Sequence, residues 1–126
     1  MPNTTLPLKS SERKRIPMYR GVLRYFPAAL AEVAQIAQRG NDKHGDTGDD
    51  DLYHWRGRSS DHPDCILRHL IDLEEDFGCG KGYDENGVPQ VAYLAWRALA
   101  LAQEWLEEVE EMPLAPAAKQ EDSDAD

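Results

Sequence analysis

Two carboxylates in the middle of the chain have the types and spacing needed to hold a metal ion. Asp61 and Asp64 lie three residues apart at the start of a predicted helix. Two carboxylates one turn apart can share a hard cation such as Mg²⁺, but one of them can equally serve as a helix cap. The sequence of this helix leaves both interpretations open.

A third carboxylate, Glu32, favours the metal interpretation. Its neighbours on the same face of an earlier predicted helix are Ala28, Ala29 and Ile36, and the polar residue one turn further on is Gln35. A carboxylate on such a small, apolar face needs a partner, because burying an unpaired charge is costly.

A cation bound jointly by Glu32, Asp61 and Asp64 would explain why all three acids are present. The alternative is a salt bridge from Glu32 to Arg39 or Arg68. We expect this cation to be Mg²⁺, because carboxylate oxygens are the ligands that such hard ions prefer.

Basic side chains are concentrated in the same part of the sequence. A polyphosphate shares its charge between a metal ion and Arg or Lys donors, so this concentration points to a nucleoside triphosphate. The alternative is an ordinary solvated surface. The candidate substrate-binding residues are Asn41, Lys43, His44, Trp55, Arg58 and Arg68, with Arg56 next to them.

A zinc site is a weaker interpretation. His62, Cys65 and His69 lie on adjoining sides of one predicted helix, and His44 and Asp64 could join His62 in a zinc-dependent phosphohydrolase. No second cysteine pair supports such a site, so a polar flank with one buried thiol is the simpler explanation.

Three predicted helices must position these residues. The first runs from Pro27 to Gly40, the second covers residues 61–77, and the third covers residues 89–111. Residues 40–60 form a connector that is longer than usual, and residues 78–88 are expected to form a turn. The sequence therefore predicts an all-α fold.

The third predicted helix is apolar on nearly all sides. Val91, Leu94, Ala98, Leu101 and Trp105 follow one stripe, and further apolar residues lie between them. A domain of this size has difficulty burying such a helix alone. We therefore expect the helical bundle to be completed by oligomerisation, as a homodimer or homotetramer.

The two ends of the 126-residue chain differ from its middle. Residues 1–15 are predicted to be a flexible arm and residues 113–126 a disordered acidic tail, which leaves residues 16–112 as the catalytic domain. The formal net charge of −10 argues against a nucleic-acid partner. The chain has two cysteines, no apolar run long enough to cross a membrane, and no signal peptide. These features predict a cytoplasmic protein.

Three blocks of sequence resemble a known family. They are Tyr19-Arg20-Gly21-Val22-Leu23-Arg24-Tyr25-Phe26 through Gly40-Asn41-Asp42-Lys43-His44, then His54-Trp55-Arg56-Gly57-Arg58-Ser59-Ser60-Asp61 through Arg68-His69-Leu70, and Val91-Ala92-Tyr93-Leu94-Ala95-Trp96-Arg97-Ala98-Leu99-Ala100. Together they resemble the phage dATP/dGTP diphosphohydrolases, which are relatives of the MazG and phosphoribosyl-ATP pyrophosphohydrolase (HisE-like) group. The MazZ type, from phages with 2-aminoadenine DNA, is the specific match, and the resemblance covers about residues 15–105.

The resemblance implies an all-α, MazG-like oligomer that uses Mg²⁺ or Mn²⁺ to cut between the α- and β-phosphates. In the MazZ setting, dGTP hydrolysis would supply dGMP to the 2-aminoadenine pathway of a phage, in the cytoplasm of its host. The MazG pattern pairs Glu-x-x-Glu on one helix with Glu-x-x-Asp on the next. Glu32 matches the first position and Gln35 replaces the second Glu, while Asp61 and Asp64 match the other pair.

These assignments give a mechanism hypothesis in which Glu32, Asp61 and Asp64 hold the divalent ions. Nearby bases would neutralise the pyrophosphate, while Asn41 and Trp55 would contact the base or sugar. The basic residues in this role are Lys43, His44, Arg58 and Arg68.

The main alternative is a non-catalytic phage accessory protein that binds a partner through its acidic end. Residues 107–126 contain eight acidic residues and one basic residue, which would suit that role.

Overall fold

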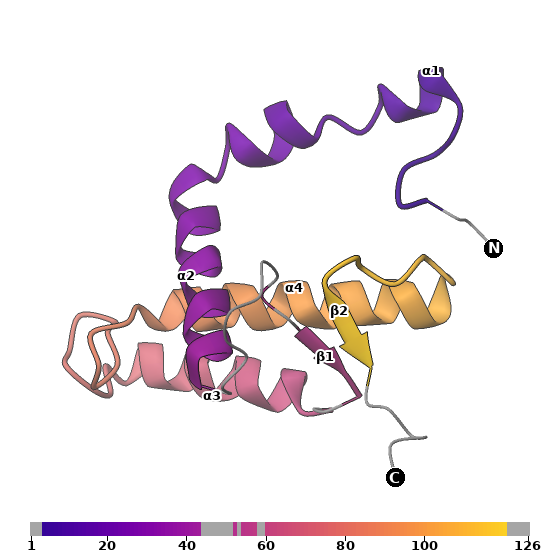
Figure 1. Ribbon diagram of the computed structural model, residues 1–126. Coiled ribbons are helices and arrows are strands. Elements are labelled where there is room, and N and C mark those ends of the chain that lie inside the picture. Colours follow the sequence, from indigo (N-terminus) through magenta and orange to yellow (C-terminus); the bar gives the residue numbers. More distant parts are fainter. Residues whose placement is uncertain (1–3, 44–51, 53, 58–59, 121–126) are drawn as a thin grey trace, which may run out of the picture.

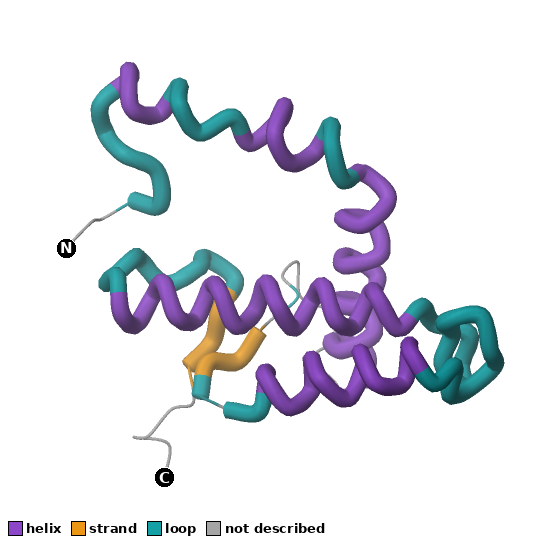
Figure 2. The backbone as a smooth tube through the Cα atoms, turned by 180° about the vertical axis from the view of Figure 1, so that it is seen from behind, coloured by secondary structure: helices purple, strands orange, loops and turns teal. Residues whose placement is uncertain are grey.

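The computed structural model describes residues 4–43, 52, 54–57 and 60–120. Three long helices dominate it: α2 (Pro27–Lys43), α3 (His62–Glu74) and α4 (Gln90–Val109). Helices α3 and α4 run antiparallel and side by side, and α2 crosses them steeply (Figures 1 and 2). The predicted all-α fold is confirmed.

The helix boundaries differ from the prediction mainly in α2. This helix continues past Gly40 and ends at Lys43, so Asn41 and Lys43 lie in its last turn instead of in a loop. A glycine inside a helix costs only about 1 kcal/mol relative to alanine, and the neighbouring residues outweigh that cost here. Helix α3 is shorter than predicted at both ends, with Asp61 as its N-cap residue.

The turn between α3 and α4 is held by glycines and by a buried aspartate. Gly78 has a positive φ of +114°, and a Cβ there would lie 2.6 Å from the Tyr83 carbonyl oxygen, so no other residue fits. Asp84 Oδ1 accepts the N–H groups of Asn86 and Val88 at 2.8 and 2.9 Å. The turn thereby returns the chain to the start of α4 in a fixed position.

The core of the single chain is small. Ile36 from α2 packs with Val88 from the turn before α4 and with Ala92 from α4 itself, and Tyr93 and Trp96 cover them. Among the described residues, no large side chain is fully buried. Much of the apolar surface of α3 and α4 therefore faces outward in one subunit.

The N-terminal arm leads into α2 and extends away from the other helices (Figure 1). It contains the short helix α1 (Ser10–Arg13) and the π-helical turn η1 (Tyr19–Leu23), which contacts α2. Most of its large apolar side chains, Tyr25 and Phe26 included, are exposed.

The C-terminal segment was predicted to be disordered from residue 113, and that prediction is wrong for its first part. Residues 113–120 return along α4, and β2 (Ala118–Gln120) pairs in parallel with β1 (His54–Arg56). His54 is opposite Ala118 and Arg56 is opposite Gln120. The reason is Glu107, whose side chain accepts the Ala115 N–H at 3.0 Å and anchors the returning chain.

No helix in the described part of the chain combines the length and the apolar character that a membrane span requires.

Candidate active site

A small cavity lies where α2 meets the turn before α4. It has a volume of about 200 Å³, and its walls come from α2 and from residues 83–89. Glu32, Gln35 and Arg39 contribute its polar groups from α2, and Tyr83 and Pro89 close the other side. The spacing of three and four residues puts the three α2 side chains on one helix face.

Glu32 is half-buried in this cavity, and no residue in the described part of the chain neutralises its charge. In the described part of the chain, neither Glu32 nor Gln35 forms a side-chain hydrogen bond or ion pair. The salt bridge from Glu32 to Arg39 or Arg68, considered as an alternative, is not formed between these described residues. A carboxylate, an amide oxygen and a guanidinium facing one cavity are suited to a metal–phosphate group.

Arg39 was missed as a site residue in the sequence interpretation. The pKa of Asp84 is lowered in the folded chain: burial raises it, but the N–H groups of Val88 and Asn86 and the Tyr93 hydroxyl lower it, and the positive charge of Arg39 makes the smallest contribution in the same direction. Tyr93 donates its hydroxyl to Asp84 Oδ2 at 3.0 Å. Its pKa is raised by burial and by this hydrogen bond. The spacing of Arg39 from Glu32 was the available signal, since residues seven apart share a helix face.

Asp61 and Asp64 lie elsewhere, at the N-terminus of α3. Asp61 is within 3.5 Å of an Arg68 nitrogen and 4.0 Å of an Arg97 nitrogen, and its Oδ2 is 3.5 Å from the Cys65 sulfur. Its side chain makes no capping hydrogen bond. Asp64 is exposed in the first turn of the helix.

The two groups of acids are separated along α4. Pro89 borders the cavity that holds Glu32, whereas Arg97 contacts Asp61. Eight residues of helix correspond to roughly 12 Å. Within the described residues of one subunit, no three His, Cys, Asp or Glu side chains gather to hold a metal. A single ion shared by Glu32, Asp61 and Asp64 therefore stays a prediction.

The remaining predicted substrate residues are only partly described. Asn41 and Lys43 lie at the end of α2, half-buried and exposed respectively, and Trp55 is in β1. His44 and Arg58 lie outside the described residues. Arg68 is exposed and binds Asp61 instead of Glu32.

Two of the histidines proposed for zinc, His62 and His69, contact protein groups instead, and His44 lies outside the described residues. His62 Nε2 is 2.6 Å from Glu104 Oε2, and His62 Nδ1 is 3.0 Å from an Arg97 nitrogen. Arginine can only donate, so Nδ1 accepts and Nε2 carries the proton that is donated to Glu104. His69 Nδ1 is 2.8 Å from Gln90 Oε1, and its ring stacks on Tyr93. Neither histidine is oriented toward an open metal position by these contacts.

A second, larger cavity of about 630 Å³ lies toward the other end of α4. Ser60, His62 and Trp105 line it, together with the carboxylates Glu104, Glu107 and Glu108. Three carboxylates repel a triphosphate, so this cavity is the poorer candidate for the phosphate end of a nucleotide.

Arg56 and Glu107 form a buried ion pair at the edge of the larger cavity. Arg56 Nε and one terminal nitrogen donate to the two carboxylate oxygens of Glu107, at 2.5 and 2.7 Å. These hydrogen bonds, helped by Gln103 and the Ala115 N–H against the effect of burial, lower the pKa of Glu107 to about 2. The pair fixes β1 against α4 and was not predicted from the sequence.

Comparison with known proteins identifies the family. The family model described as "dATP/dGTP diphosphohydrolase, N-terminal" matches residues 8–113, which begin inside the predicted arm and end at the first residue of the returning C-terminal segment. Neither a curated protein nor a solved structure matches the chain. Membership indicates a diphosphohydrolase and argues against the non-catalytic alternative. The chain belongs to the dATP/dGTP diphosphohydrolase family.

Proposed function

We propose that the chain hydrolyses a purine deoxynucleoside triphosphate, dGTP or dATP, to the monophosphate and pyrophosphate. Water adds to the α-phosphorus, the bond from that phosphorus to the oxygen bridging to the β-phosphate breaks, and pyrophosphate leaves. The observation that carries the proposal is Glu32, which is half-buried, has no hydrogen-bond or ion-pair partner among the described residues, and faces a cavity with Gln35 and Arg39. The family membership supports the same class of reaction.

The donors at the smaller cavity suit Mg²⁺ or Mn²⁺. Mg²⁺ is commonly held by one or two carboxylates, with substrate phosphates and water completing its shell. Glu32 and Gln35 would supply the protein ligands there, and Asp61 with Asp64 is the second proposed pair. When bound, such an ion neutralises phosphate charge and makes water a stronger nucleophile.

The remaining polar residues have proposed roles in holding the substrate. Arg39 faces the cavity and would hold phosphate oxygens by charge and hydrogen bonds. Lys43 and Arg68, with His44 and Arg58, would neutralise the pyrophosphate as it leaves. Asn41 and Trp55 would contact the base or sugar. A cavity of about 200 Å³ is too small for a whole nucleotide, so it is assigned to the phosphate end.

The biological setting follows from the sequence resemblance. We place the chain in a phage of the MazZ type, where the dGMP product would feed synthesis of a 2-aminoadenine nucleotide. The large exposed apolar side chains support a homodimer or homotetramer, since a soluble monomer seldom leaves so much apolar surface uncovered.

A substrate panel tests the proposed reaction. The full-length protein is incubated with each of the eight common ribo- and deoxyribonucleoside triphosphates in the presence of Mg²⁺, Mn²⁺ or a chelator. Release of monophosphate and pyrophosphate is then measured. We expect dGTP or dATP to be the best substrate and the chelator to stop the reaction.

Two results would contradict the proposal. One is release of inorganic phosphate in place of pyrophosphate, which would mean cleavage at another bond. The other is equal activity with and without chelator. Metal analysis of protein purified without chelator separates Mg²⁺ from Zn²⁺.

A further inference from the structure

Helix α4 carries an apolar stripe whose side chains are mostly exposed. The spacing along this stripe alternates between four and three residues, which is the heptad pattern of a helix that packs on another helix. We call these six positions the seam: Val91, Ala95, Ala98, Ala102, Trp105 and Val109.

Five of the six seam residues are exposed in a single subunit, and Ala95 is half-buried. Val91, Trp105 and Val109 are 51%, 50% and 58% exposed, and Ala98 and Ala102 are also exposed.

The flanking side chains and charges agree with a helix-packing surface. Leu99 and Leu106 flank the seam and are exposed as well, whereas the charged side chains Arg97 and Glu104 are turned toward His62 on α3. A charge-free helix face that runs the full length of a 20-residue helix is a packing surface without its partner.

We infer that the seam packs on the seam of a second copy of this chain, with the two α4 helices antiparallel. The spacing of the seam reads the same in both directions about residue 100. An antiparallel pair centred there places Val91 opposite Val109 and Ala98 opposite Ala102 of the second copy. It also places the large Trp105 opposite the small Ala95, so that the two faces are complementary in size.

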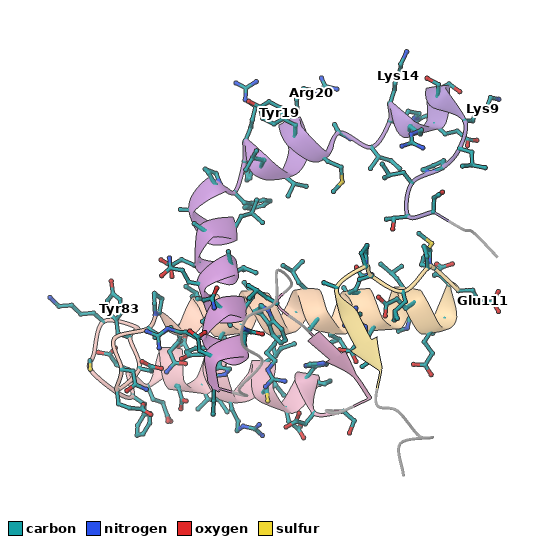
Figure 3. All side chains as sticks on the ribbon, viewed as in Figure 1. Lys9, Lys14, Tyr19, Arg20, Tyr83 and Glu111 are labelled. Carbon is teal, nitrogen blue, oxygen red and sulfur yellow. The ribbon has the colours of Figure 1, made fainter. Side chains whose placement is uncertain are left out.

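The charges at the two ends of α4 favour the same orientation. Glu111 lies at the C-terminal end of α4, and Tyr83 lies in the turn at the opposite end (Figure 3). Glu108 and Glu110 are close to Glu111 in the sequence, whereas the turn contains Lys81 as well as Asp84 and Glu85. A parallel pair would bring the two acidic ends together. An antiparallel pair places each acidic end near a helix N-terminus, whose dipole attracts negative charge.

The second copy would also lie beside the larger cavity. Trp105 belongs to the seam and lines that cavity with Leu101 and His62. The inference deepens the oligomer proposed above and does not depend on the proposed reaction, because its tests measure mass and cross-linking, not hydrolysis.

Light scattering after size exclusion tests whether the seam holds two copies together. The wild-type protein should have the mass of a dimer or a multiple of it. Ala98→Glu with Ala102→Glu, at the centre of the seam, should halve the measured mass. Ala31→Glu is the matched control, since it makes the same change at an exposed position of α2. A monomeric wild type, or equal loss of mass in the control, would overturn the inference.

A cysteine pair tests the antiparallel orientation. Val91→Cys and Val109→Cys are introduced together in a Cys79→Ser background, because Cys79 is exposed. The two positions are roughly 27 Å apart within one helix, so a disulfide joining them must link two chains. We expect oxidation to give a covalent dimer whose digest contains the linked 91 and 109 peptides.

Oxidation products other than the 91–109 link would contradict the inference. Links joining 91 to 91 and 109 to 109 would show a parallel pair, and absence of any covalent dimer would show that the seams do not meet. A normal dimer that hydrolyses neither dGTP nor dATP would contradict the proposed function alone.

Discussion

The polar side chains near the two ends of α4 differ in whether they are bound by other protein groups. Near its start, Glu32 and Gln35 face a cavity and form no side-chain hydrogen bond or ion pair within the described residues. Near its end, Arg56 and Glu107 satisfy one another through two short hydrogen bonds, and Gln103 donates a third at 2.9 Å.

This difference indicates which end of α4 is suited to binding a ligand and which end stabilises the fold. A buried pair whose members are both satisfied holds the chain in place and offers little to a ligand. A half-buried carboxylate without a protein partner carries a cost that a bound cation would remove. The start of α4 is therefore the better candidate for chemistry, and its end is the better candidate for stability.

The largest expected effect comes from Glu32→Gln. This change keeps the shape of the side chain but removes the charge that would bind the metal ion. We expect turnover of dGTP to fall by more than about 1,000-fold, because charge stabilisation of the phosphates is lost. Pyrophosphate release is the measurement, and thermal unfolding should show an intact fold.

Glu12→Gln in the arm is the matched control for Glu32→Gln. Glu12 is exposed and far from the cavity in the sequence, so its loss should leave turnover within about twofold. Substantial activity in the Glu32 variant would remove this residue from the site.

The next largest effect is on stability, from Glu107→Gln. Removing one member of a buried pair leaves the other charge uncompensated, and the side chain of Arg56 is only 9% exposed. We expect the free energy of unfolding to fall by about 3 kcal/mol, measured by urea denaturation. Glu108→Gln, at an exposed neighbour, should change it by less than about 0.5 kcal/mol. Equal effects of the two changes on the free energy of unfolding would show that the pair of Arg56 and Glu107 does not stabilise the fold more than an exposed residue does.

The stabilising effect of Glu107 should also depend on pH. Its pKa is lowered from 4.5 to about 2 in the folded chain, so its contribution is fully present above pH 4.5. As the pH falls from 4.5 toward 2, the unfolded state takes up the proton more readily and that contribution is lost. The stability difference between wild type and Glu107→Gln should therefore shrink over this range, in urea titrations at a series of pH values.

The smallest expected effect is a gain, from Gln35→Glu. This change would restore the second acid of the Glu-x-x-Glu pattern and add a carboxylate beside Glu32. We expect the Mg²⁺ concentration for half-maximal activity to fall several-fold, since a second charged ligand strengthens binding of a hard cation. An unchanged Mg²⁺ dependence would place the metal away from Gln35.

Local sequence patterns predicted the helices well. The apolar periodicity of α2, α3 and α4 gave their existence and order, because a helix must bury a continuous stripe. It misplaced the end of α2, since Gly40 is a good terminating residue but three further residues still form helix. The same patterns assigned residues 113–120 to a disordered tail. Local patterns do not show the contacts that order these residues, because Glu107 in α4 and the strand β1 are not their neighbours in the sequence.

In the candidate site as well, local sequence patterns determined some features and tertiary packing determined others. The sequence by itself determined that Glu32, Gln35 and Arg39 share one face of a helix, because their spacing matches the helical repeat. Only the tertiary structure decided that this face meets the turn before α4 while Asp61 lies beside Arg97. Helix periodicity fixes which side chains point the same way, whereas the crossing of α2 over α4 depends on the packing of Ile36, Val88 and Ala92, which no local pattern encodes.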